Sequence, residues 1–121
     1  MRITHLLILV FVILALSGCK KEDEDDLANI TTLTLPIASF SYTGNDQPAP
    51  ATIQFTNTSE YADAFAWDFG DGGSSTNANP THIYYNSSDK PKSFLVKLTA
   101  TDTYSDKSNT RSRSITILPG N

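Results

Sequence analysis

The stretch FAWDFGDGGSST, Phe65–Thr76, holds the side chains of this 121-residue chain whose types and spacing could do chemistry. Asp68 and Asp71 lie close together, and Asn side chains follow. Closely spaced Asp and Asn oxygens are ligands that Ca²⁺ accepts. The same carboxylates can instead accept hydrogen bonds from backbone N–H groups of a tight turn, in which Gly adopts a positive φ without steric cost. Because Asp-Gly is a strong turn pair, we expect a structural turn with no metal or other cofactor. The alternative is a calcium site at Asp68 and Asp71.

Enzymatic hydrolysis would need a nucleophile beside a base, or two converging acids. From Cys19 onward the chain has one His, His82, which alternates with Tyr84 as residues packed in a strand do. Asp68 and Asp71 share one turn, and no cleft-forming segment accompanies them. The sequence therefore predicts that the protein is not an enzyme.

The elements that must position these residues are predicted to be strands. From Leu33 onward, apolar and polar residues alternate, as in half-buried strands, and turn-rich segments separate the alternating stretches. Those stretches read PIASFSY, ATIQFTN, AFAWDFG, THIYYN, FLVKLTATD and SITIL. This spacing predicts an all-β fold, an antiparallel β-sandwich of about seven strands. Trp67 shares the inward side of its strand with Phe65 and Phe69, so we expect it in the core.

Five segments resemble PKD domains, the Ig-like sandwiches named after the polycystic kidney disease protein. PIASF, PATIQFTNTS, FAWDFGDG, NPTHIY and FLVKLTATD occur in the order seen in that family, and the resemblance covers residues 35–118. The motif residues are Trp67, Asp68, Phe69, Gly70, Asp71, Gly72, Pro80, His82 and Tyr84. The family usually has a Gly where Lys92 stands, and a Gly in the turn that reads TYSDKS here. The resemblance implies an extracellular binding or spacer module, since few PKD domains carry chemistry.

The N-terminal segment predicts a membrane address. Arg2 and His5 precede the apolar run Leu6–Leu16, which is long enough for a secretory signal and too short to span a bilayer. The next residues, LSGC, resemble a bacterial lipoprotein signal, which implies that residues 1–18 are removed and that Cys19 is lipidated. Cys19 is the only Cys and cannot form an internal disulfide. The alternative is an ordinary signal peptide with an incidental Cys.

Residues 19–34 are predicted to form a lipidated, acidic tether. The charge run KKEDEDD, Lys20–Asp26, cannot pack a core and is expected to stay solvated. In one group of Gram-negative bacteria, Lys followed by acidic residues just after the lipidated Cys marks export to the outer face of the outer membrane, and Lys21–Asp23 resembles that pattern. We therefore expect a lipid-anchored outer-membrane protein that faces the cell exterior. The inner leaflet of the outer membrane is the alternative.

The charge distribution bears on partners. The formal net charge is −4, and no Lys or Arg occurs between Leu33 and Asp89, so nucleic acid is not an expected partner. Basic residues gather near the C-terminus and include Lys97, Arg111 and Arg113. They either protect a sheet edge from aggregation or form a weak site for acidic glycans or an acidic protein loop.

One detail of the strand pattern has two explanations. Arg111 and Arg113 are separated from the inward-facing Ile115 and Ile117 by even numbers of positions, so a regular strand would point all four side chains to the same side. Either a bulge shifts the register, or both Arg side chains lie past the edge of the core.

Three outward apolar residues complete the candidate binding surface. Ile37, Ile83 and Tyr85 are expected to point outward from the other sheet, and if clustered they would form an apolar patch for a partner. Tyr85 is the aromatic residue that we expect to stack on a sugar ring. The sequence thus favours a surface lipoprotein whose domain binds a glycan or protein. The alternative is a structural spacer or assembly component of the envelope.

Overall fold

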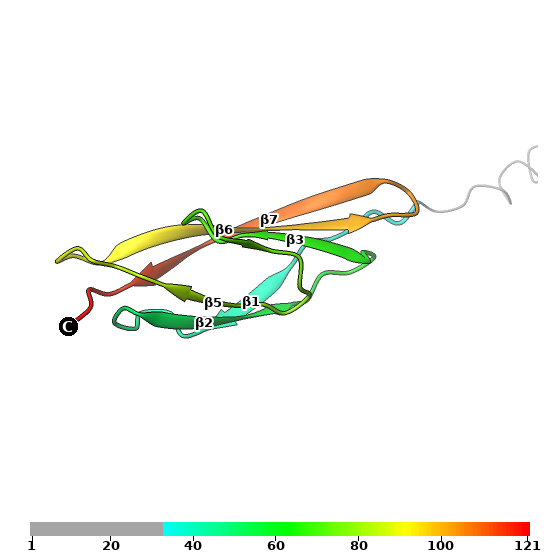
Figure 1. The fold of residues 1–121 in the computed structure, drawn as a ribbon. Helices are drawn as coiled ribbons and strands as arrows, with labels where there is room; N and C mark the ends of the chain where they lie inside the picture. Colours follow the sequence, from blue (N-terminus) through cyan, green and yellow to red (C-terminus); the bar gives the residue numbers. More distant parts are fainter. Residues whose placement is uncertain (1–32) are drawn as a thin grey trace, which may run out of the picture. The chain divides into compact units, whose positions relative to one another are not determined.

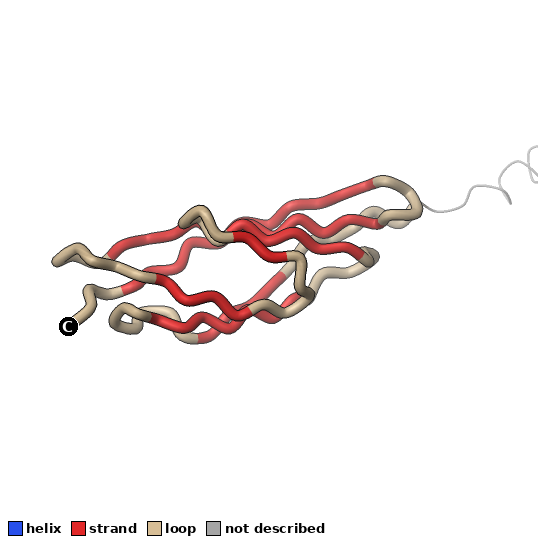
Figure 2. Tube along the Cα trace, in the orientation of Figure 1, coloured by secondary structure: helices blue, strands red, loops and turns tan. Residues whose placement is uncertain are grey.

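The computed structural model describes residues 33–121, and Thr34–Asn121 form one compact unit (Figure 1). Seven strands make up this unit: β1 (Phe40–Thr43), β2 (Ala51–Asn57), β3 (Ala64–Asp68), β4 (Ser74–Ser75), β5 (Thr81–Tyr84), β6 (Lys92–Asp102) and β7 (Lys107–Ile117). They form two antiparallel sheets, with strand orders β1-β2-β5 and β4-β3-β6-β7, that face each other (Figure 2). The predicted seven-stranded antiparallel β-sandwich is confirmed.

The predictions for the signal peptide, Cys19 and most of the tether lie outside the described residues. Residues 33–121 contain no helix that is long and apolar enough to cross a membrane.

The core forms because alternate residues of each strand point into the space between the sheets. The buried apolar residues are Ala38, Phe40, Ala51, Ile53, Phe55, Trp67, Phe69, Tyr84, Phe94, Val96, Leu98, Ala100, Ile115 and Ile117. Trp67 is only 2% exposed, and its ring centroid lies 5.1 Å from that of Phe40 and 5.3 Å from that of Phe55. Its indole N–H donates a hydrogen bond to the Asn77 carbonyl oxygen at 2.9 Å, so the one polar atom of the side chain has a partner. Trp67 is thus a core residue, as the alternation predicted.

The β6–β7 ladder decides between the two explanations for Arg111 and Arg113. Its register runs without interruption from the Lys92–Ile117 pair to the Asp102–Lys107 pair, so a bulge is the wrong explanation. Both Arg residues pair with inward-facing residues of β6 but are themselves exposed, because the core does not extend over that half of β7. The Arg113 guanidinium lies 5.9 Å from the Phe40 ring centroid, over the edge of the core.

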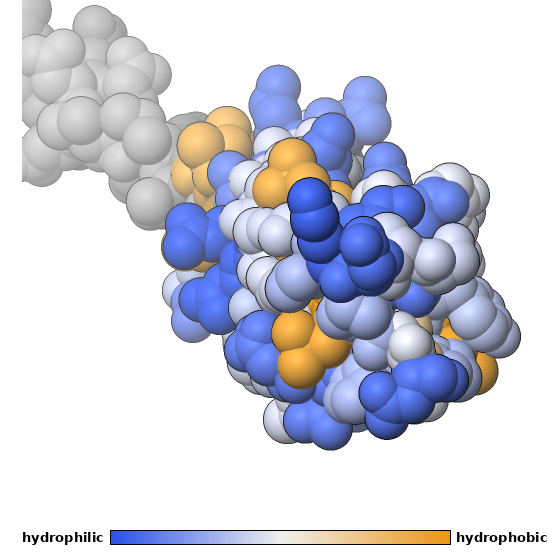
Figure 3. Space-filling view, turned by 90° about the vertical axis from the view of Figure 1, so that its left-hand side faces the viewer, coloured by the Kyte–Doolittle hydropathy of each residue, from blue (hydrophilic) through white to orange (hydrophobic). Residues whose placement is uncertain are grey.

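Loops from both sheets meet at each end of the domain. At the end where the described chain begins, the Asp63 N–H donates to the Thr101 carbonyl at 2.9 Å and joins the β2–β3 loop to β6. At the opposite end, the Asp46 N–H donates to the Thr116 carbonyl at 2.9 Å and joins the β1–β2 loop to β7, near the C-terminus. Seen from that C-terminal end, apolar surface residues form separate islands among hydrophilic ones (Figure 3).

Candidate functional site

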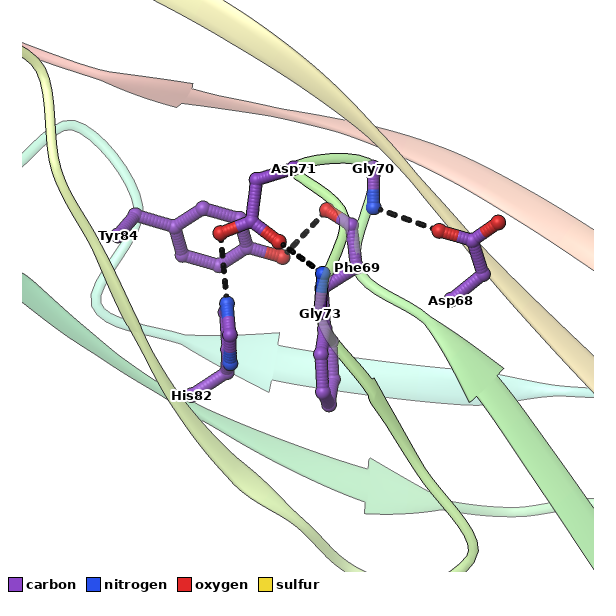
Figure 4. A network of polar contacts seen from close by, with 7 residues as sticks. All are labelled: Asp68, Phe69, Gly70, Asp71, Gly73, His82 and Tyr84. Carbon is purple, nitrogen blue, oxygen red and sulfur yellow. Dashed lines mark hydrogen bonds and ion pairs between the residues drawn. The ribbon is translucent and has the colours of Figure 1, made fainter.

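The GDGG segment is a β-hairpin turn between β3 and β4. The Phe69 N–H donates to the Gly73 carbonyl at 3.0 Å and closes the hairpin. Each Asp accepts a hydrogen bond from the backbone two residues later: Asp68 Oδ1 from the Gly70 N–H at 2.9 Å, and Asp71 Oδ1 from the Gly73 N–H at 3.0 Å (Figure 4). Both carboxylates therefore stabilise the turn in the way that turn chemistry predicts. Within residues 33–121, no group of three His, Cys, Asp or Glu side chains is placed to hold a metal ion.

Asp71 also contacts His82, a pairing that the sequence pattern did not predict. The His82 Nε2 atom lies 2.7 Å from Asp71 Oδ2, and the imidazole stacks on the Phe69 ring at 4.1 Å between centroids. Burial raises the pKa of the Asp71 carboxyl, but the hydrogen bonds from His82 and from the Gly73 N–H outweigh it, so the net pKa is lowered. The parity of His82 with Tyr84 indicated that His82 points inward, but nothing in the local pattern placed it beside a turn eleven residues away.

Tyr84 ties strand β5 to the same turn. Its side chain is fully buried, and its hydroxyl donates to the Phe69 carbonyl oxygen at 2.9 Å (Figure 4). Burial, and then the negative charges of Asp71 and Asp68, raise the pKa of the Tyr84 hydroxyl far above its usual range. The phenol therefore stays protonated and remains a donor. The β3–β4 hairpin of one sheet is thus bonded to strand β5 of the other sheet through aromatic and carboxylate residues of the WDFGDG and PTHIY segments.

The predicted apolar residues are exposed but do not form one patch. Ile37 pairs with Glu60 just beyond β2, whereas Ile83 pairs with Thr52 in β2 itself. At about 3.3 Å per residue, these two rows of the sheet are about 26 Å apart. Tyr85 follows Ile83 along the same strand direction and is 70% exposed. The structure therefore brings Ile83 and Tyr85 near each other and leaves Ile37 at the opposite end.

The three basic candidates also lie on different faces. Lys97 pairs with Asp68 in the β3–β6 ladder and with Ser112 in the β6–β7 ladder, which places it on the outer face of the sheet. Arg111 and Arg113 are on the inner side of β7, past the core. No single basic surface includes all three.

Tyr85 lies at the rim of a shallow hollow at the C-terminal end of the domain. The hollow measures about 180 Å³, and its lining consists of Ala49, Pro50, Tyr85, Asn86, Ser87 and Gly120. Asn86 is engaged in the local structure: its amide N–H₂ donates to the carbonyls of Lys90 and Ile117, and its Oδ1 accepts from Ser88. The hollow therefore offers apolar contact and few available polar groups.

A second and larger hollow lies at the other end of the domain. It measures about 360 Å³ and has Thr34, Tyr61, Ala62, Asp63 and Asp102 as its lining. Tyr61 is 57% exposed and belongs to the β2–β3 loop, while Asp102 ends β6. No sequence pattern singled out these residues, because a Tyr in a loop has no alternating neighbours that indicate which way its side chain points.

Comparison with known proteins agrees with this architecture. The family model described as PKD domain matches residues 35–117. The PKD1 domain of Vibrio anguillarum Epp is 26% identical, with a TM-score of 0.57 over 71% of this chain and 96% of that one. The PKD1 domain of the Vibrio cholerae metalloprotease PrtV is 30% identical, with a TM-score of 0.58 over 70% of this chain and 99% of that one.

A third similar structure bears on binding. It is described as a study of the promiscuous specificity of carbohydrate-binding modules from the β-sandwich superfamily. It is 27% identical, with a TM-score of 0.61, and the match covers 71% of this chain but only 35% of that one. No curated protein matches the chain significantly. On the family match and on the fold, the chain belongs to the PKD domain family.

Proposed function

We propose that this protein is a non-catalytic lipoprotein, anchored in the outer membrane and facing the cell exterior, whose PKD domain binds carbohydrate. The observation that carries the proposal is that each end of the domain has a surface hollow with an exposed tyrosine in its lining, Tyr85 at one end and Tyr61 at the other. Exposed aromatic rings beside a concavity suit the apolar faces of sugar rings. Similarity to a structure whose description concerns carbohydrate-binding modules also supports carbohydrate as the ligand.

The polar network of the GDGG turn supports a non-catalytic role. The Asp71–His82 pair has the form of a base with its orienting carboxylate, but catalysis would also need a nucleophile within reach. The hydroxyl that shares this network, that of Tyr84, is buried and donates its proton to the Phe69 carbonyl. The network therefore serves packing and turn geometry.

The anchor is proposed from the LSGC segment and from Cys19 as the only Cys. Replacement of Cys19 by Ser should leave a precursor that is neither cleaved nor lipidated, because the thiol is the acceptor of the lipid. Growth with a clickable fatty acid, followed by labelling of the purified protein, measures this directly. Equal labelling of wild type and Cys19→Ser would show that the anchor is not at this residue.

A glycan array tests the carbohydrate proposal. The full-length protein, kept in mild detergent, is applied to an array of neutral, amino and acidic glycans. Binding to a defined subset supports the proposal, and the absence of any saturable binding contradicts it.

A spacer role is the second candidate. Its support is that the first described residues and the C-terminus lie at opposite ends of the domain, so that the chain runs through the length of the module (Figure 1). A spacer binds no glycan and tolerates replacement of either exposed tyrosine without loss of function.

A further inference from the structure

We propose that the hollow between the β2–β3 loop and the end of β6 is the carbohydrate-binding site, with Tyr61 as the platform for an uncharged sugar and with Asp63 and Asp102 as acceptors for its hydroxyl groups. This inference rests on the proposed function and gives it a location and a ligand class. It also moves the site away from Tyr85, the residue that the sequence favoured. At about 360 Å³, this hollow falls within the range of ligand pockets, roughly 300–1,000 Å³.

Both carboxylates are held in place by residues of the turn between β6 and β7. Asp63 accepts from the backbone N–H of Thr103 at 2.9 Å through Oδ1, and from its hydroxyl at 2.6 Å through Oδ2. Asp102 accepts from the Tyr104 N–H at 3.0 Å and from the Ser105 hydroxyl at 2.6 Å, again one bond to each oxygen. An ionised carboxylate can accept about four hydrogen bonds. Each side chain thus keeps acceptor capacity for a ligand, and its orientation is set before the ligand arrives.

Tyr61 has an unusual backbone for a large side chain. Its φ is +56°, in the left-handed region that bulky residues rarely adopt. The residue is 57% exposed, so its side chain is not part of the buried core. Strained residues of this kind gather at ligand sites, where they aim a side chain. Here the side chain contributes to the lining of the hollow, next to Asp63.

The hollow beside Tyr85 is the weaker candidate on the same criteria. Its volume, about 180 Å³, is half as large. Its one amide, that of Asn86, uses both its N–H₂ group and its oxygen within the protein. A sugar there would find an apolar wall and would leave most of its hydroxyl groups without a partner, which costs affinity.

The charge of the Tyr61 hollow defines the ligand class. None of its lining residues is Lys, Arg or His. Hydrogen bonds from the Thr103 hydroxyl and backbone N–H lower the pKa of the Asp63 carboxyl, so this residue stays ionised at neutral pH. Sugar hydroxyls donate to such oxygens, whereas uronic acids and sulfated sugars would place like charges together. We therefore expect neutral glycans to bind and acidic glycans to be rejected.

The test uses four full-length proteins in mild detergent: wild type, Tyr61→Gly, Tyr85→Ala and Tyr104→Ala. Gly accepts the positive φ of position 61, so Tyr61→Gly removes the ring without unfolding the domain, and its melting temperature should stay close to that of wild type. Tyr104 is 99% exposed and near the same end, but it does not line the hollow, so Tyr104→Ala is the matched control. The glycan that binds best on the array is then titrated into each protein by calorimetry.

The expected result is a neutral glycan whose affinity falls about tenfold or more in Tyr61→Gly and is unchanged in Tyr85→Ala and Tyr104→Ala. Loss of affinity in Tyr85→Ala with none in Tyr61→Gly would overturn the assignment of the site, while the proposed function would stand. Binding confined to acidic glycans would overturn the ligand class in the same way. If wild type bound no glycan at all, the proposed function would fail and this inference with it.

Discussion

Replacement of Gly70 by Ala tests how closely the hairpin turn packs on strand β6. Gly70 has a φ of +80°, and a Cβ atom there would lie 2.5 Å from the backbone oxygen of Leu95 in β6. Gly72 is the matched control: its φ is +94°, but a Cβ would meet no atom within 4 Å. Both substitutions impose a left-handed backbone on a residue with a Cβ. Only Gly70→Ala also forces the turn against a central strand.

The two variants are expected to lose different amounts of free energy of unfolding. The left-handed backbone costs each of them about 1–2 kcal/mol. The overlap with Leu95 adds about 1–3 kcal/mol for Gly70→Ala, because β6 is paired on both sides and cannot move aside. We therefore expect the free energy of unfolding to fall by about 2–5 kcal/mol in Gly70→Ala and by about 1–2 kcal/mol in Gly72→Ala.

Urea denaturation followed by Trp67 fluorescence measures both values. Trp67 is the only Trp and is buried, so its emission should shift to the red in one cooperative step as the sandwich unfolds. Equal losses in the two variants, or a larger loss in Gly72→Ala, would refute the close packing of the turn on β6.

Three further predictions concern the same network. Because its pKa is lowered in the folded protein, Asp71 stabilises the fold fully above about pH 4, and this contribution is lost as the pH falls further. The free energy of unfolding of the wild type, measured as a function of pH, should therefore fall more steeply in acid than that of Asp71→Asn. Equal acid slopes for the two proteins would contradict this prediction. Tyr84→Phe removes the donor to the buried Phe69 carbonyl and should lower the free energy of unfolding by about 1–3 kcal/mol in urea denaturation, while an unchanged midpoint would contradict a stabilising role for this hydrogen bond. Millimolar Ca²⁺ should leave the melting temperature unchanged, because Asp68 and Asp71 already bond the turn; a rise of several degrees that Asp68→Asn abolishes would instead establish a calcium site.

The strands could be predicted because their signal is local. In β6, burial alternates from Phe94 through Ala100, and the sequence FLVKLTATD shows the same alternation except at the exposed Leu95. In the hairpin, each Asp carboxylate accepts a hydrogen bond from the N–H of the Gly two residues later, so the interaction is also local. The alternation along β7 allowed Arg111 to be on the inner side of its strand, past the core, or to follow a bulge. Only the unbroken β6–β7 register excluded the bulge.

The candidate site could not be predicted in the same way. Tyr61, Asp63 and Asp102 come from a loop and a strand end that are far apart in the chain, and they meet because the Asp63 N–H bonds the Thr101 carbonyl. No alternation extends into the β2–β3 loop, so nothing local indicated that Tyr61 has a positive φ or contributes to a hollow. Tyr85, in contrast, lies beside a strand, where parity predicted its exposure.

Residue types and their spacing along the chain determined the fold class, the core Trp67 and the structural character of the GDGG turn, because alternation and turn propensity depend on neighbours a few residues away. Stacking of the two sheets decided which side chains meet. It placed His82 against Asp71, joined the Tyr84 hydroxyl to the opposite turn, and separated the surface candidates to the two ends of the domain. Such contacts depend on strand pairing and register over the whole domain, and no short window of sequence contains that information.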